Sequence, residues 1–119
     1  MIDLSQELVI DSLAGLLENF WNVSGEKIAK LESERDPDEG TPVFTVEGQY
    51  VAQGWTEWTQ GFQFGSSIIQ YDATGDSEFL ESGRRATVEY MASHVTHFGV
   101  HDHGFNNVST YGALRRLML

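Results

Sequence analysis

Three residues, Thr74-Gly75-Asp76, join two stretches of helical apolar spacing, and this short joint constrains the fold more than any other feature. Glycine readily takes the left-handed conformation that ends a helix, and aspartate is a preferred N-cap of the next one. The sequence therefore predicts a helix over about residues 58–74, another over about residues 77–93, and an antiparallel helical hairpin made by the two.

Glycines at four-residue spacing mark the first helix of this pair. Gly61 and Gly65 each cost roughly 1 kcal/mol of helix propensity relative to alanine. Such spacing indicates that another helix or a bound ligand approaches the backbone closely, and we favour plain helix packing. The residues that recur at steps of three and four, and so share one side of the helix, are Trp55, Trp58, Phe62, Gly65 and Ile69.

Two further helices are predicted around this pair, which gives an all-α single domain of four helices over residues 1–119. Apolar spacing predicts the first over about residues 5–22, with Asp3 or Ser5 as its N-cap and a further turn through residues 27–31. The fourth begins at about Asn106 or Asn107. The sequence ends inside this fourth pattern without a stop signal, as we expect of a truncated protein.

Residues 32–53 interrupt the helical spacing. They contain Pro37, Pro42 and a run of acidic residues, so they predict a long loop with a short extended piece at residues 43–46. Loops of this length are uncommon in compact domains and are often functional.

Charge and composition exclude several classes of function. The net charge of −11, from 18 acidic and 7 basic side chains, repels phosphate backbones and anionic lipids, so we expect neither nucleic-acid nor membrane binding. The chain has no cysteine, which excludes disulfides and cysteine-based metal sites. Because the N-terminus lacks the basic segment of a signal peptide and no apolar run is long enough to cross a bilayer, we expect a cytoplasmic protein.

Residues 101–105, His-Asp-His-Gly-Phe, form the densest cluster of reactive groups and follow two other histidines closely. A metal site would use His97, His101 and His103 with Asp102 as a fourth ligand, but this spacing matches no metal motif. Asp102 is also a candidate for acid–base chemistry, because a carboxylate between two helices can be desolvated and hydrogen-bonded. In the third interpretation, which spacing alone favours, Asp102 caps a turn and the histidines are solvated loop residues.

An aromatic cluster precedes and enters the second predicted helix. Aromatic faces can stack on sugar rings, but they also supply much of the buried area of a core. We expect Phe62 to lie in the core, whereas core packing and sugar binding stay equally open for Trp55 and Trp58. The cluster comprises Tyr50, Trp55, Trp58, Phe62 and Phe64.

Three motifs occur in a fixed order: W-T-Q-G-F at residues 58–62, Y-D-A-T-G-D-S-E-F-L at residues 71–80, and H-D-H-G-F at residues 101–105. In order and spacing they resemble the opening of the unsaturated glucuronyl hydrolases of glycoside hydrolase family 88 and the related unsaturated rhamnogalacturonyl hydrolases of family 105. The resemblance spans about residues 55–119. His103 departs from it, because many members carry an apolar residue there.

The resemblance implies an (α/α)6 barrel of six helical hairpins, of which this chain would supply the opening part. It also implies hydrolysis of lyase-generated oligosaccharides that end in a C4–C5 unsaturated uronic acid. A carboxylic acid protonates C4, water adds at C5, and the hemiketal opens to release the sugar and a keto acid. No metal or organic cofactor is implied.

The resemblance places individual residues as well. Asp102 corresponds to the first active-site aspartate of the family, beside the substrate, and His101 to a neighbouring polar group. Trp58 corresponds to an aromatic of the pocket wall, and Trp55 and His103 are further candidates for substrate contacts. The second aspartate, the usual proton donor, would lie beyond residue 119.

Two other functions stay open. A non-catalytic helical domain could use the aromatic cluster to bind carbohydrate or a partner protein, and an incomplete barrel would expose an apolar edge through which copies could associate. A sugar isomerase or epimerase built on the same barrel is the third hypothesis.

Overall fold

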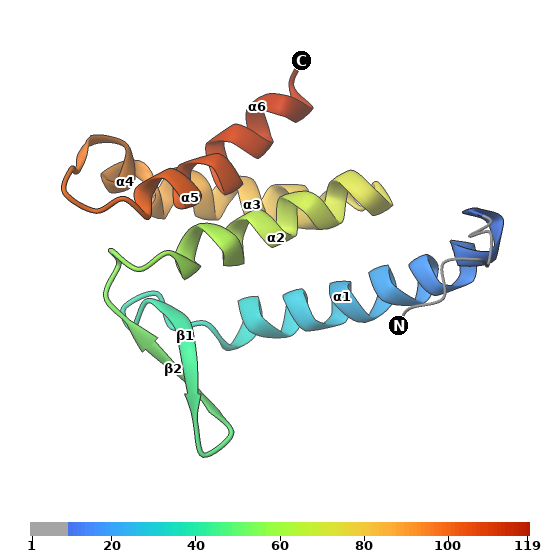
Figure 1. Cartoon of the computed structure of the whole chain (residues 1–119), viewed down its shortest axis with the longest axis horizontal. Helices are drawn as coiled ribbons and strands as arrows, with labels where there is room; N and C mark the ends of the chain where they lie inside the picture. Colours follow the sequence, from blue (N-terminus) through green and yellow to red (C-terminus); the bar gives the residue numbers. More distant parts are fainter. Residues whose placement is uncertain (1–9) are drawn as a thin grey trace, which may run out of the picture.

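The computed structural model describes residues 10–119, which are mostly helical and include one two-stranded antiparallel sheet (Figure 1). The helical prediction is therefore confirmed, but the expectation of a purely all-α fold is wrong. The predicted N-caps Asp3 and Ser5 lie outside the described residues. In chain order the elements are a 3-10 helix η1 (Ile10–Leu13), α1 (Ala14–Glu34), β1 (Thr41–Val46), β2 (Gln49–Gln53), α2 (Thr59–Thr74), α3 (Ser77–Tyr90), α4 (Ala92–Thr96), α5 (His103–Asn107), a π-helical stretch η2 (Val108–Gly112) and α6 (Ala113–Leu117).

The predicted helical hairpin is confirmed as α2 and α3. Gly75 has a φ of 75° and its N–H donates to the carbonyl of Tyr71 at 2.7 Å, which closes α2 in the left-handed conformation. The Asp76 carboxylate accepts the N–H of Glu78 at 3.0 Å and so caps α3. Both roles follow from the local sequence, and for this reason the joint could be predicted.

The prediction of a long loop over residues 32–53 is wrong, but the extended piece predicted at residues 43–46 is confirmed as part of β1. Its first residues continue α1 to Glu34, and most of the remainder forms the β1–β2 hairpin with Val46 opposite Gln49. Glu47 and Gly48 form the turn with φ values of 49° and 79°, and a two-residue turn with positive φ at both positions matches the twist of the strands. Strand-forming residues on both sides of this turn outweigh the loop signals that the prolines and acids provide.

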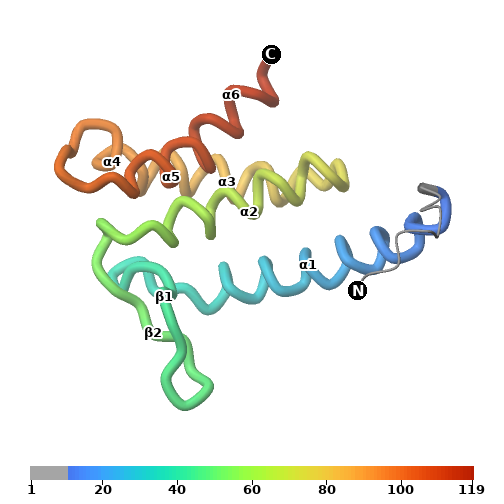
Figure 2. The backbone as a smooth tube through the Cα atoms, viewed as in Figure 1, coloured from blue at the N-terminus to red at the C-terminus, as the bar shows by residue number. Residues whose placement is uncertain are grey.

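The fourth helix begins at His103, three residues before its predicted start at Asn106, and continues through α5, η2 and α6 (Figure 2). It packs along α2, which also contacts α1 on another side. Thr110 lies inside the π-helical stretch, and its hydroxyl donates to the carbonyl of Asn106 at 2.7 Å. Single π turns inside α-helices often occur near functional sites.

Gly61 and Gly65 serve helix packing, as the sequence analysis favoured. A Cβ at Gly65 would lie 2.5 Å from the carbonyl oxygen of Ser109, and one at Gly61 would overlap the backbone of Asn106. The backbones of α2 and the fourth helix can approach this closely only because both positions lack a side chain.

The buried face of α2 differs from the predicted one. Trp58, Phe62 and Ile69 share one side of the helix as expected, but each is close to half exposed. The prediction that Phe62 belongs to the core is therefore wrong. The buried residues of α2 are Gln60, Gly61, Phe64, Gly65, Ser67, Ile68 and Gln70.

The hydrophobic core forms between α2, α3 and the fourth helix. Phe64, Ala86 and Met91 are buried there, and Tyr90 and Tyr111 pack against them. The helix α1 continues past the end of α2 (Figure 1), and its side chains Leu16, Leu17 and Phe20 are 68%, 50% and 56% exposed. Over residues 10–119, no helix combines the length and the apolar character needed to cross a membrane.

We expect Gly65→Ala to lower the free energy of unfolding by roughly 1–3 kcal/mol, because the new methyl group would overlap the backbone of Ser109. Gly15→Ala is the matched control, since Gly15 lies in α1 with no atom near its missing Cβ, and it should raise stability by about 0.5–1 kcal/mol. Urea denaturation measures both variants. A Gly65→Ala protein as stable as the original chain would contradict the close helix contact.

Candidate functional site

Asn106 joins the start of α2 to the loop that precedes α5. Trp58, at the N-cap of α2, makes no side-chain cap hydrogen bond. The side-chain oxygen of the fully buried Asn106 accepts the N–H of Gly61, the third residue of α2, at 2.6 Å. Its amide group donates to the carbonyls of Glu57 at 3.1 Å and Asp102 at 3.2 Å. One side chain therefore satisfies a free N–H group of the first turn and fixes Asp102 relative to the turn before Trp58.

Asp102 and Trp58 line the same shallow hollow, of about 310 Å³, together with Phe62 and Phe105. The Asp102 side chain is 27% exposed and its carboxylate lies 3.1 Å from Nε2 of His101, whose side chain is 88% exposed. Asp102 occupies the N-cap position of α5 but makes no side-chain cap hydrogen bond there. The interpretation of Asp102 as a capping residue is therefore wrong, and Asp102 instead lines the surface hollow and contacts His101.

Exposed aromatic rings line the hollow together with Asp102. The Trp58 and Phe62 rings meet edge to face with centroids 5.3 Å apart, and Phe62 stacks near Phe105 at 6.4 Å. Trp58 is 45% exposed and Phe105 54% exposed. Phe62 and Phe105 also line a neighbouring hollow of about 540 Å³ that includes His101. The surface is thus an apolar strip with Asp102 and His101 at its edge, a composition suited to a sugar ring with one polar and one apolar face.

A second cluster, the histidine cluster, consists of His94, His97 and His103 with the side-chain amide of Gln60. Nδ1 of His103 lies 2.9 Å from Nδ1 of His94, and Nε2 of His103 lies 2.8 Å from Nδ1 of His97. Nε2 of His94 lies 2.9 Å from Oε1 of Gln60 on α2. The three rings therefore form a continuous series of hydrogen bonds that ends on α2.

Trp55 covers the histidine cluster and not the hollow that contains Asp102. Its indole stacks on His103 with centroids 5.7 Å apart and planes 11° apart, and it meets His94 and His97 edge to face. The sequence left core packing and sugar binding open for Trp55 and Trp58. The structure separates the two, since Trp55 packs on histidines and Trp58 stands in the hollow.

Burial changes the titration of the inner histidines. His94 is 1% exposed and His103 is 5% exposed, so the interpretation of the histidines as solvated loop residues is wrong for these two. Burial, followed by the repulsion of His103 and His97, lowers the pKa of His94 from 6.5 to about 4. Burial and His97 also lower the pKa of His103, while the nearby Asp102 acts in the opposite direction.

The metal hypothesis for His97, His101, His103 and Asp102 finds no support in this geometry. His103 directs its two nitrogens to two different imidazoles, and His101 contacts Asp102 instead. In the part of the chain that the structure describes, no group of three histidine or acidic side chains could hold a metal ion.

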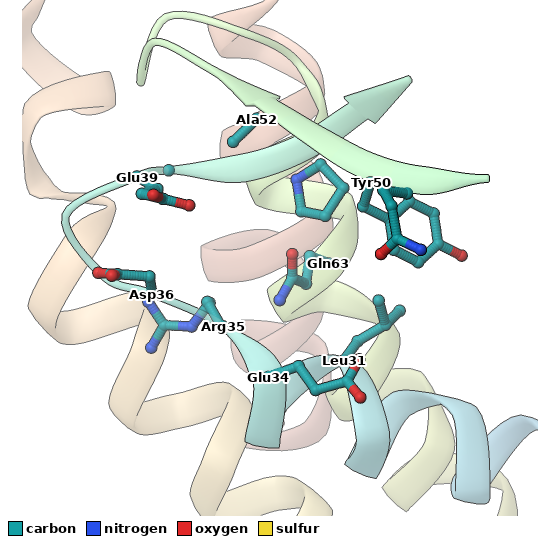
Figure 3. Close-up of a pocket in the computed structure, with 11 residues that line it drawn as sticks. Leu31, Glu34, Arg35, Asp36, Glu39, Tyr50, Ala52 and Gln63 are labelled. Carbon is teal, nitrogen blue, oxygen red and sulfur yellow. The ribbon is translucent and has the colours of Figure 1, made fainter. Parts of the chain in front are cut away.

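A more enclosed cavity of about 190 Å³ lies between the end of α1 and the β hairpin (Figure 3). Arg35 lines it, but its guanidinium stacks on Tyr90 and Phe64 at 4.7 and 5.3 Å from the ring centroids and lies 3.7 Å from Glu32. These contacts give Arg35 a structural role, because they attach the end of α1 to the core.

Comparison with known proteins adds no further assignment: no protein-family model, no curated protein and no solved structure matches this chain.

Part of the candidate site could be predicted from the sequence. Trp58, Asp102 and His101 come together as expected, whereas Trp55 and His103 belong to the histidine cluster. Gln60 and Asn106 were missed, because a single amide inside a helical pattern carries no sequence signal of the partner it binds. Phe105 was not predicted as a site residue, although its place in the H-D-H-G-F motif could have identified it.

We expect Asn106→Ala to lower the free energy of unfolding by about 2–4 kcal/mol, since it removes three hydrogen bonds at a fully buried position. Asn106→Asp should cost at least as much, because it retains the acceptor for Gly61 but buries a carboxylate oxygen against the carbonyls of Glu57 and Asp102. The matched control is Asn19→Ala on the exposed surface of α1, which should leave stability nearly unchanged. Equal stability of Asn106→Ala and Asn19→Ala would show that Asn106 does not join these segments.

Proposed function

We propose that this chain provides the sugar-contacting edge of a helical-barrel glycoside hydrolase that acts on C4–C5 unsaturated uronic acids. The observation that carries the proposal is the shared hollow of Asp102 and Trp58, two residues that lie 44 positions apart in the sequence. Residues of the first and third motifs line the hollow together: Trp58 and Phe62 from the first, and Asp102 and Phe105 from the third.

In this proposal the apolar face of the terminal sugar stacks on Trp58 and Phe62, which are both 45% exposed. The Asp102 carboxylate then lies beside the sugar ring, where it can accept hydrogen bonds from the substrate and from water. Protonation of C4 and addition of water at C5 need a second carboxylic acid, which the family resemblance places beyond residue 119. Asp102 would orient the substrate and the water, and the second aspartate would deliver the proton.

The (α/α)6 barrel is part of the same proposal. It is supported by the antiparallel α2–α3 hairpin and by apolar side chains that the described helices leave uncovered. Leu16 of α1, Val88 of α3 and Val108 of η2 are 68%, 65% and 71% exposed. Further hairpins of a barrel, or association between copies, would remove such side chains from water.

A non-catalytic carbohydrate-binding domain is the second candidate function. It is supported by the composition of the hollow: among residues 10–119, Asp102 is accompanied there by three aromatic residues and by no second carboxylate. The two functions differ in turnover, since a binding domain would leave the C4–C5 double bond intact.

We expect an unsaturated uronic acid disaccharide to bind this chain, and Trp58→Ala to weaken that binding about tenfold or more through the loss of stacking. Tyr50→Ala is the matched control, because Tyr50 is an exposed aromatic on the β hairpin, away from the hollow. Isothermal titration calorimetry gives both affinities. Equal weakening of the affinity by the two substitutions would show that Trp58 does not contact the sugar.

In a protein that carries this chain together with the second aspartate, Asp102→Asn should lower turnover by about 100-fold or more while the disaccharide still binds. The loss of the vinyl-ether absorbance measures turnover. Asp38→Asn, an exposed position in the turn before β1, is the matched control. Undiminished turnover in Asp102→Asn would exclude Asp102 from the mechanism.

A further inference from the structure

We propose that the histidine cluster is a pH-operated device that holds the loop carrying Asp102 in place while its rings are neutral and releases the loop when they become charged. The cluster spans this loop directly. His94 belongs to α4, His97 follows α4 immediately, and His103 is the first residue of α5. The contacts among the three rings therefore connect the two ends of residues 97–102.

Proton counting limits the number of protons that these contacts can hold. A neutral imidazole has one N–H donor and one acceptor nitrogen, and each hydrogen bond between two nitrogens needs one proton. Because the Gln60 oxygen accepts from Nε2 of His94, Nδ1 of His94 must accept from Nδ1 of His103. Nε2 of His103 then accepts from Nδ1 of His97. If Gln60 presents its amide N–H instead, every proton moves to the other end of its hydrogen bond, and each bond still holds one.

The cluster can hold one added proton but not two. The first can enter on the outward Nε2 of His97 and leaves one proton in each hydrogen bond. A second would go to His94 or His103 and would place two N–H groups opposite each other, at 2.9 Å between these two rings or at 2.8 Å between His103 and His97. Protonation of the two buried rings beyond this first step therefore breaks the series of hydrogen bonds.

The groups around the cluster favour the neutral rings. Gln60 of α2 and Trp55 are uncharged, and Asn107 of α5 donates only to the backbone carbonyl of His94. Asp102, itself paired with His101, is the carboxylate that raises the pKa of His103, and burial together with His97 exceeds its effect.

The direction of the pH dependence follows from the lowered pKa values. Because the pKa of His94 in the closed form is about 4, below the ordinary 6.5, the open form binds protons more strongly than the closed form. The closed form is therefore fully favoured above pH 6.5, and it loses stability relative to the open form as the pH falls from 6.5 to about 4. Release would free residues 97–101 and with them the contact of His101 with the Asp102 carboxylate, whereas the Asp102 carbonyl stays bonded to Asn106. An effect of this release on a bound sugar would rest on the proposed function, whereas the release of the loop does not.

Nuclear magnetic resonance of the whole chain tests the device without any sugar. Nitrogen spectra of the imidazoles should show neutral His94 and His103 at pH 6.5, and both should take up protons in one transition whose midpoint lies between 6.5 and about 4. The backbone amides of Gly99 and Val100 in the loop should shift with the same midpoint. The fluorescence of Trp55, assigned by its loss in Trp55→Phe, should change with them.

Two substitutions test whether the transition belongs to the histidine cluster or to a histidine outside it. His103→Gln should abolish the shared transition, since glutamine donates and accepts a hydrogen bond but takes up no proton in this range. His101→Gln removes an imidazole outside the cluster and should leave the transition in place. If His103→Gln fails to fold, the titration of the unmodified chain still tests whether the loop amides follow the protonation of His94 and His103.

Three results would overturn the proposal. The first is protonation of His94 and His103 at pH 6.5 and above, and the second is a loop whose amides do not follow the two rings. The third is loss of the helical circular dichroism at the same midpoint, because the release would then be global unfolding. None of these readouts involves carbohydrate, so failure of the proposed function leaves the test unaffected.

Discussion

The contact between α2 and the fourth helix determines the rest of the structure. Gly61 and Gly65 let the two backbones approach so closely that Asn106 reaches the first turn of α2 and accepts the N–H of Gly61 at 2.6 Å. The same side chain donates to the carbonyls of Glu57 and Asp102. The position of Asp102 beside Trp58 is therefore a consequence of helix packing, and a side chain at either glycine would move the two apart.

Features that depend on neighbouring residues could be predicted from the sequence, and features that depend on distant partners could not. Gly75 and Asp76 end one helix and start the next through bonds to Tyr71 and Glu78, all within a few residues. The β hairpin was missed because each strand forms only by pairing with the other. Its turn also requires a positive φ at Glu47, which is uncommon for a residue with a side chain.

The buried face of α2 could not be predicted from hydrophobic spacing, and the reason is physical. Spacing points to the side with Trp58, Phe62 and Ile69. Close backbone contact instead places Gly61 and Gly65 against the fourth helix, so the buried side is the one that carries these glycines together with Phe64 and Ile68. The aromatic side then remains on the surface, and it is this exclusion from the core that makes a surface hollow with exposed rings available next to Asp102.

Asp102 and His103 are consecutive, yet they serve different parts of the molecule. Successive residues at the start of a helix point about 100° apart, so the carboxylate of Asp102 faces the surface hollow while the ring of His103 faces inward to His94 and His97. A change at His103 can therefore alter what holds the loop without altering the groups that the loop presents. The imidazole of His103 contributes to a pH-dependent stability of the loop, because both of its nitrogens are bonded to other imidazoles and the three rings together can hold only a limited number of protons.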